Sequence, residues 1–224
     1  MRLTVFNGSP RGEKSTTRIL LQHFLDGFMA TEGNSHEVLD LIRLKEGDRF
    51  VESFREAEHV LLAFPLYHDS MPAMVKTFIE SLEPLQGRTE NPSIGFLVHS
   101  GFPEANHSRY VERYLEKLAR RLGCKYLGTI IKGGANRIDE QPGFMSNGVF
   151  KSFRELGRSF GETGQFDERI VAKLASPERL PAPMRWMFRV VLKTRFAYLG
   201  WNKHLKANNA YEKRFARPYA SGDD

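Results

Sequence analysis

The chain has 224 residues, of which 41% are hydrophobic and 27% charged, a composition that excludes a globally disordered protein. Its net charge of +6 favours anionic partners such as phosphates, nucleotides, nucleic acid or an acidic membrane surface. The single cysteine, Cys124, excludes an internal disulfide and any iron–sulfur or zinc site built from several thiolates. No apolar run is long enough for a signal peptide or a membrane span, so we expect a cytoplasmic protein.

Apolar runs and helical patterns alternate from the first residues onward. Buried strands are predicted at residues 3–6, 36–42, 59–64, 94–98 and 126–131. Helices are predicted between them, near residues 15–28, 48–57, 71–82 and 111–122. The run 59–64 is continuous rather than alternating, as expected when helices cover both faces of a parallel sheet. This order predicts an α/β fold with a doubly wound, five-stranded parallel sheet.

The alternation stops after residue 134. A loop is predicted at residues 135–148, followed by helices near residues 149–161 and 167–175 and by an apolar, basic segment at 184–205. No further strand pattern appears. We therefore expect one sheet domain, residues 1–134, and a C-terminal helical extension, residues 135–224, that packs on it.

The loop after the first strand is typical of an anion site. Ser9, Arg11, Ser15 and Thr16 lie between that strand and the helix that follows. Hydroxyls, backbone amides and the arginine would meet where a helix N-terminus carries partial positive charge. Ligands of open α/β sheets bind outside the carboxyl ends of the strands, where this loop lies. We predict phosphate binding; the alternative is a helix cap with a solvated arginine.

Residues 8–15 nearly match the nucleoside triphosphatase loop G-x-x-x-x-G-K-[ST]. Lys14 and Ser15 fit, but Glu13 stands at the second glycine position, where a carboxylate would repel phosphates. The third strand also ends in Phe64-Pro65, without a metal-binding aspartate. We therefore reject a triphosphatase site.

The loops after the third and fourth strands are half apolar. Residues 65–72 contain an aromatic ring, an apolar side chain and a hydroxyl. The prolines at both ends, Pro65 and Pro72, limit the backbone freedom of this loop. Residues 99–103 again contain an aromatic residue and a glycine. Beside a phosphate site, such loops suit a mononucleotide with a large planar head group.

Three motifs together resemble the flavodoxin-like NAD(P)H-dependent FMN oxidoreductases, a family that includes flavin and quinone reductases. They are residues 8–11 with Ser15 and Thr16, residues 65–72, and residues 75–79, and the match covers about residues 1–134. The resemblance implies a flavodoxin-like fold, bound FMN, and NADPH or NADH as co-substrate. It implies that Ser9, Arg11, Ser15 and Thr16 hold the FMN phosphate. It also implies that the isoalloxazine is surrounded by Pro65, Leu66, Tyr67, His68, Asp69, Ser70, His99, Ser100 and Gly101.

Two departures from the family pattern matter. Many relatives carry Asn where this chain has Ser15, which leaves a shorter hydrogen-bonding arm. The cysteine cluster of the iron–sulfur members is also missing, so electrons are expected to move through flavin alone.

The activity that the resemblance implies is hydride transfer from a nicotinamide cofactor, through flavin, to a quinone, flavin or similar small acceptor. Such a transfer requires no acid–base side chain, so we assign no catalytic residue, and no spacing of ligands indicates a metal. His68 and His99 could donate protons to a quinone, bond the flavin, or be hydrogen-bonded loop residues. Asp69 is expected to order its own loop, and Cys124 to lie inert in the core.

Two alternatives to an enzyme are a flavodoxin-type electron carrier and a flavin-binding sensor or interaction protein. The positive charge and the long extension count against a carrier. Within residues 184–205, basic and apolar residues at helical spacing predict a helix buried against the sheet domain or a second subunit. A helix lying on an anionic membrane is the less favoured alternative. We expect a homo-oligomer that acts on a small molecule and binds no nucleic acid.

Overall fold

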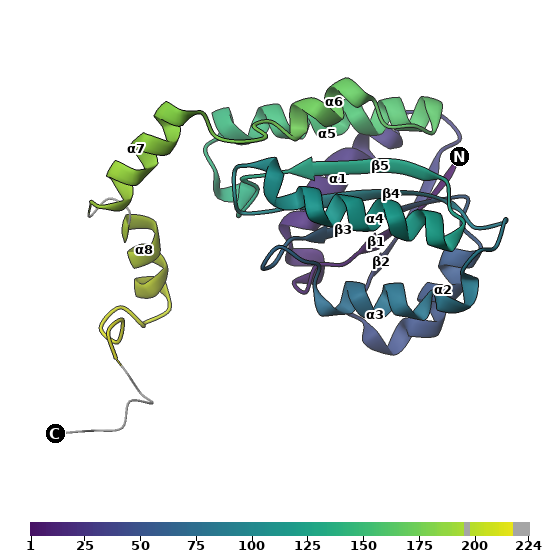
Figure 1. Cartoon of the computed structure of the whole chain (residues 1–224), viewed down its shortest axis with the longest axis horizontal. Coiled ribbons are helices and arrows are strands. Elements are labelled where there is room, and N and C mark those ends of the chain that lie inside the picture. The colour runs from purple at the N-terminus through teal and green to yellow at the C-terminus, as the bar shows by residue number, and fades with distance from the viewer. Residues whose placement is uncertain (195–197, 217–224) are drawn as a thin grey trace. The chain divides into compact units, whose positions relative to one another are not determined.

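The computed structural model describes residues 1–194 and 198–216. Its five strands form one sheet in the order β2–β1–β3–β4–β5, and every pairing is parallel (Figure 1). The strands are β1 (Arg2–Asn7), β2 (Ser35–Asp40), β3 (His59–Pro65), β4 (Ser93–His99) and β5 (Tyr126–Lys132). The strand order reverses between β1 and β3, and ligands of such sheets bind at the carboxyl ends of the strands beside this point. The predicted doubly wound sheet is confirmed.

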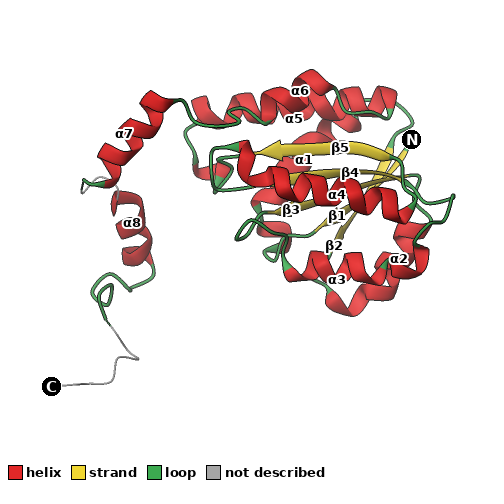
Figure 2. Ribbon diagram, viewed as in Figure 1, coloured by secondary structure: helices red, strands yellow, loops and turns green. Residues whose placement is uncertain are grey.

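Helices cover both faces of this sheet (Figure 2). They are α1 (Thr16–Phe28), α2 (Gly47–Arg55), α3 (Ala73–Ser81), α4 (Arg109–Leu122), α5 (Gly143–Thr163) and α6 (Glu168–Leu174). Side chains of α1, α5 and α6 share one core cluster with the sheet, and those of α2, α3 and α4 share another. In β1, Val5 faces the first cluster and Phe6 the second. Burial on both faces explains why β3 is continuously apolar between Val60 and Phe64.

Helix α5 differs from its prediction. Residues 143–148 were expected in a loop because they include two glycines and an asparagine, yet α5 begins at Gly143, directly after its N-cap Pro142. Within the added turns Ser146 is buried, and farther along α5 is in close contact with α1. A Cβ on Gly157 would lie 1.8 Å from the Phe24 carbonyl oxygen, so the two helix backbones touch. Tertiary packing here overrides weak local helix propensity.

One side chain of α4 also departs from expectation. Helical spacing puts Tyr114 on the apolar stripe with Val111, Leu115 and Leu122, but Tyr114 is 45% exposed while those three are buried. The tyrosine lies at the edge of the stripe, where its hydroxyl stays in water.

The chain divides into two compact units, Met1–Arg179 and a second that begins at Leu180. Helices α5 and α6 therefore lie in the same unit as the sheet, although the sequence analysis placed them in the extension. The second unit contains α7 (Ala182–Leu192) and α8 (Leu199–Ala207). The expected segment 184–205 spans both helices, and its residues 195–197 lie outside the described part of the chain. Packing of the second unit on the first stays a prediction.

None of the helices in the described ranges is long and apolar enough to cross a membrane.

Candidate functional site

The loop after β1 is shaped by Asn7, the last residue of that strand. Its side-chain amide donates to Asp40 Oδ1 at 2.7 Å and to the Gly12 carbonyl at 3.2 Å. Its Oδ1 accepts the Ser9 amide at 3.2 Å. Gly12 takes a φ of +52°, which favours glycine. The sequence carries no signal for this role of Asn7, because its contact with Asp40 depends on the pairing of β1 with β2.

Ser15 is the N-cap of α1. Its hydroxyl accepts the Arg18 amide at 3.1 Å and donates to the Gly12 carbonyl at 2.6 Å. A serine hydroxyl has a single hydrogen, and here it is already engaged. Ser15 therefore shapes the loop in this conformation, and its contact with a phosphate stays a prediction. The backbone amides of Thr16 and Thr17 have no acceptor in the described part of the chain, as is usual in the first turn of a helix.

Arg11 brings positive charge to this loop. It is exposed and forms no ion pair among residues 1–194 and 198–216. The Glu13 carboxylate, which was expected to repel phosphates, is exposed, and its Oε1 lies 3.7 Å from the Arg43 guanidinium. The loop thus presents a free guanidinium next to free helix amides, the combination that binds anions at helix N-termini.

The loop after β3 divides into a wall and a turn. Pro65, Leu66 and Tyr67 form the wall, held to β4 by the Leu66 amide, which donates to the His99 carbonyl at 2.7 Å. Tyr67 and Ser70 then exchange backbone hydrogen bonds of 2.8 and 3.0 Å. This pairing closes a two-residue turn with φ values of 45° at His68 and 60° at Asp69, the left-handed values of a type I′ turn.

The turn separates three predicted site residues from the wall. His68, Asp69 and Ser70 are exposed on it, and the Asp69 carboxylate lies 3.8 Å from the ring of His107. The sequence pattern does not predict that these residues lie at the tip of a turn. Their position depends on the backbone hydrogen bonds between Tyr67 and Ser70.

His99, at the end of β4, is buried, and its Nε2 lies 2.8 Å from the Thr17 hydroxyl. Burial lowers the pKa of His99 to about 4, so the ring is neutral near pH 7. This favours the hydrogen-bonded interpretation of His99 over a proton donor. The next residue, Ser100, donates its hydroxyl to the Phe102 carbonyl at 3.0 Å. The Thr17–His99 bond therefore joins the first turn of α1 to the loop after β4.

These loops enclose a cavity of about 270 Å³ at the carboxyl ends of β1, β3 and β4. It is lined by Ser9, Arg11, Ser15, Thr16, Pro65, Leu66, Tyr67, His99, Ser100, Gly101 and Asn136. All but Asn136 were predicted as site residues; of the predicted set, His68, Asp69 and Ser70 do not line the cavity. Among the described residues around it, one is cationic and none is acidic. Asn136 gave no sequence signal, since it follows β5 in a segment expected only to be a loop.

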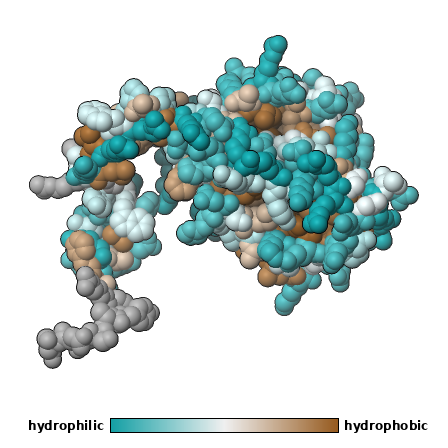
Figure 3. Space-filling model, in the orientation of Figure 1, coloured by the Kyte–Doolittle hydropathy of each residue, from teal (hydrophilic) through white to brown (hydrophobic). Residues whose placement is uncertain are grey.

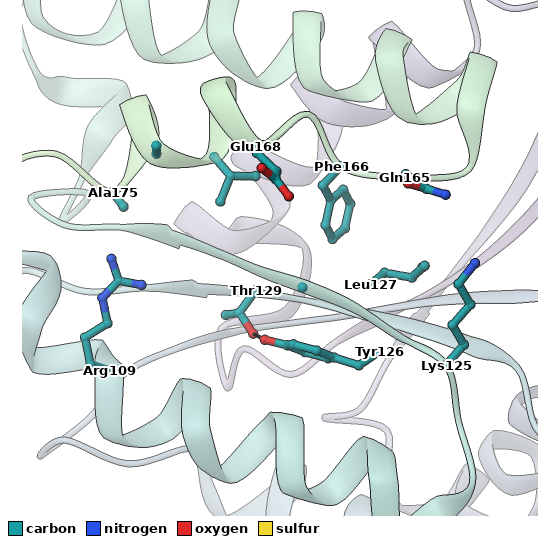
Figure 4. Close-up of a pocket in the computed structure, with 12 residues that line it drawn as sticks. Arg109, Lys125, Tyr126, Leu127, Thr129, Gln165, Phe166, Glu168 and Ala175 are labelled. Carbon is teal, nitrogen blue, oxygen red and sulfur yellow. Dashed lines mark hydrogen bonds between the residues drawn. The ribbon is translucent and has the colours of Figure 1, made fainter.

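A larger cavity, of about 440 Å³, lies along the edge strand β5 between α4 and α6 (Figure 4). Phe166 covers it from one side, and the Tyr126 hydroxyl lies 2.8 Å from that of Thr129 on the other. Its strand residues, 126–129, come from the amino half of β5, away from the carboxyl ends of the sheet. None of the predicted site residues lines it, so the smaller cavity is the candidate site.

A family model described as a flavodoxin-like fold matches residues 1–147. The chain belongs to this flavodoxin-like family. The matched residues contain every residue that lines the smaller cavity, so the flavodoxin-like part of the chain carries the candidate site.

Solved structures share this flavodoxin-like fold. An NAD(P)H:quinone oxidoreductase from Methanothermobacter marburgensis matches with a TM-score of 0.58 and 17% identity, covering 71% of this chain and 96% of that one. An FMN-dependent NADH-azoreductase from Bacillus anthracis, solved with FMN, matches with a TM-score of 0.56 and 13% identity, covering 72% of this chain and 100% of its own. An NADH:FMN oxidoreductase in its apo form matches with a TM-score of 0.51 and 18% identity, covering 79% of this chain and 96% of that one. No curated protein matches by sequence.

Proposed function

We propose that this chain is an FMN-dependent NAD(P)H oxidoreductase that passes a hydride to a quinone, a flavin or a similar small acceptor. The observation that carries the proposal is the cavity at the carboxyl ends of the strands. It combines a free guanidinium and free helix amides with an apolar, aromatic wall, and no acidic residue is among the described side chains that line it. The names of the similar structures, an azoreductase and a quinone oxidoreductase, agree with this reaction class.

The residues present fit FMN. Arg11, the Ser9 hydroxyl and the amides of Thr16 and Thr17 would hold its phosphate. Ser9 Oγ accepts the Arg11 amide at 3.3 Å, which leaves its own hydrogen available to donate. Pro65, Leu66 and Tyr67, with residues 99–101, would border the planar ring, because they line the same cavity.

Bound FMN supplies the redox chemistry, accepting a hydride from the nicotinamide and delivering it to the acceptor. The chain's own residues position and shield the reactants. Leu66, fixed to β4, excludes water from one side, and Tyr67, 46% exposed, stands where a second substrate would enter. Neutral His99 holds Thr17 and with it the first turn of α1. No described side chain is required as an acid or base.

Binding is tested by incubating the purified protein with FMN, dialysing it and recording the visible spectrum. We expect a yellow protein. Arg11→Ala should weaken FMN binding about 10- to 100-fold, the range of a charge-assisted hydrogen bond. Lys14→Ala is the matched control, because Lys14 lies in the same loop, is exposed and does not line the cavity. Equal affinities in the two variants would overturn the phosphate assignment.

Steady-state consumption of NADH or NADPH with a quinone tests the reaction itself. Turnover is expected from the enzyme, whereas tight FMN binding without turnover would favour the electron-carrier alternative. The homo-oligomeric state and the cytoplasmic location stay predictions. Light scattering on the protein as it leaves a size-exclusion column tests the oligomeric state.

A further inference from the structure

The unit that begins at Leu180 exposes many large apolar side chains. Neither α7 nor α8, both fully described, contains a buried residue. In α7 the exposed fractions run from 39% at Val191 to 68% at Trp186. The exposed apolar residues of that helix are Met184, Trp186, Met187, Phe188, Val190, Val191 and Leu192. Contiguous exposed apolar surface of this kind marks an interaction site.

Polar and apolar residues are segregated around α7. Successive residues of a helix lie about 100° apart, so Arg185, Arg189 and Lys193 form one line along it. The remaining arc spans about 240° and contains all the exposed apolar residues of the helix, with Trp186 at one edge beside Lys193 and Leu192 at the other edge beside Arg185. Figure 3 shows hydrophobic and hydrophilic surface side by side along this helix. Such a helix can lie in the plane of a membrane surface with its apolar face inserted.

The net charge of the protein resides in this unit. Residues 180–224 contain nine Lys or Arg and three Asp or Glu, whereas residues 1–179 contain 24 of each. Among the described residues, Arg185, Arg189 and Lys193 take part in no ion pair. A second copy of the chain would offer either its own positively charged residues 180–224 or its residues 1–179, whose net charge is zero. Charge complementarity therefore favours an anionic surface over self-association.

Aromatic rings and cations are also mixed beyond α8. The Arg214 guanidinium lies 4.0 Å from the ring centre of Tyr211 and 4.8 Å from that of Phe215. The second tryptophan of the protein, Trp201, is 63% exposed in α8. Tyrosine and tryptophan beside basic residues are typical of the membrane–water interface.

We propose that residues 180–194 and 198–216 belong to a membrane-docking unit whose partner is the surface of a bilayer containing anionic lipids. The unit lies on the bilayer and does not cross it, because α7 and α8 are only about 17 and 14 Å long against a hydrocarbon core of about 30 Å. A nucleic acid would supply negative charge but no apolar surface on which the apolar arc of α7 could be buried. This proposal does not depend on the flavin site.

The test mixes the full-length protein with phosphatidylcholine vesicles that contain either no anionic lipid or about one-third phosphatidylglycerol, followed by co-sedimentation. We expect binding to the anionic vesicles only, weakened by salt, since surface attraction is screened beyond about 10 Å at 0.1 M. Both tryptophans, Trp186 and Trp201, lie in this unit, so their emission should shift to the blue on binding.

Two sets of variants sharpen this test. Replacing Arg185, Arg189 and Lys193 together by Gln should weaken binding about 100-fold, because each basic residue near an anionic surface contributes about fivefold. The matched control replaces Arg113, Lys117 and Arg121 by Gln. These have the same charge and spacing but lie on the exposed side of α4 in the first unit. The double variant Met187→Gln, Leu192→Gln should still be attracted to anionic vesicles by its charge, but its tryptophan emission should no longer shift to the blue.

Equal binding to both vesicle types, or equal loss in the α7 and α4 variants, would overturn the proposal. A blue shift that depends on protein concentration without vesicles would do the same, since it would identify a second copy as the partner. All changed side chains are exposed, and far-UV circular dichroism verifies that each variant is folded.

Discussion

Two side chains that line the candidate site, those of Ser15 and His99, form hydrogen bonds within the protein itself. Ser15 caps α1 and bonds to the Gly12 carbonyl. Ser15→Ala should therefore lower the free energy of unfolding by about 1 kcal/mol, the usual effect of losing an N-cap. Its FMN affinity should fall much less than that of Arg11→Ala. Ser15→Asn is the control, because Asn is an equally good N-cap. Urea unfolding and FMN titration measure the two effects, and a loss of affinity as large as that of Arg11→Ala would contradict the assignment.

The low pKa of buried His99 makes folding sensitive to acid. The folded protein binds this proton only near pH 4, whereas an unfolded histidine binds it near pH 6.5. Between these values the unfolded state holds more protons, so stability is complete above pH 6.5 and falls as the pH drops. The loss is about 3 kcal/mol from this group. Urea unfolding at pH 7 and pH 4.5 should show a smaller decrease for His99→Gln than for the natural chain; an identical decrease would contradict the low pKa.

At the scale of elements, the contact between α1 and α5 depends on glycine. Gly157→Ala would place a methyl group 1.8 Å from the Phe24 carbonyl oxygen, so the helices would have to separate. We expect a loss of about 2 kcal/mol or more in unfolding free energy. Gly148→Ala lies in the same helix with nothing within 4 Å and should stabilise by up to about 1 kcal/mol. Thermal unfolding compares the two variants, and a neutral Gly157→Ala would show that the helices are not packed this closely.

The elements best predicted from sequence are those whose pattern reflects burial. The continuous run at residues 59–64 predicted β3 because both faces of that strand are covered, and the predicted edges of the other strands shift by only one or two residues. The start of α5 could not be predicted, because Gly143 and Gly148 weaken the helical pattern there, and the contact of Gly157 with α1 joins segments far apart in the sequence. In the site, Ser9, Arg11 and the wall at residues 65–67 followed from their place after a strand. The roles of Asn7, Thr17 and Asn136 depend on which loops meet, and His68 leaves the wall only because Tyr67 pairs with Ser70.

At the scale of the whole molecule, the two units carry different spectroscopic signals. Both tryptophans lie in the second unit, whereas the sheet and α1–α6 lie in the first. Tryptophan emission therefore reports on the unit that begins at Leu180, and far-UV circular dichroism reports mainly on residues 1–179. We expect the two unfolding curves in urea not to coincide, with the emission changing at lower urea because α7 and α8 bury no residue. Superimposable curves would show that the units unfold as one.

The edge strand β5 has a further consequence for a protein that gathers on a surface. Its register with β4 shifts between Ile94 and Gly95, next to Gly128, so the amino half of its outer edge is irregular. Regular edges of neighbouring molecules can join into continuous sheets, and a bulge hinders this by twisting the edge out of alignment. Crowding many copies onto a small area would raise the risk of such edge-to-edge pairing, and the register shift in β5 would hinder it.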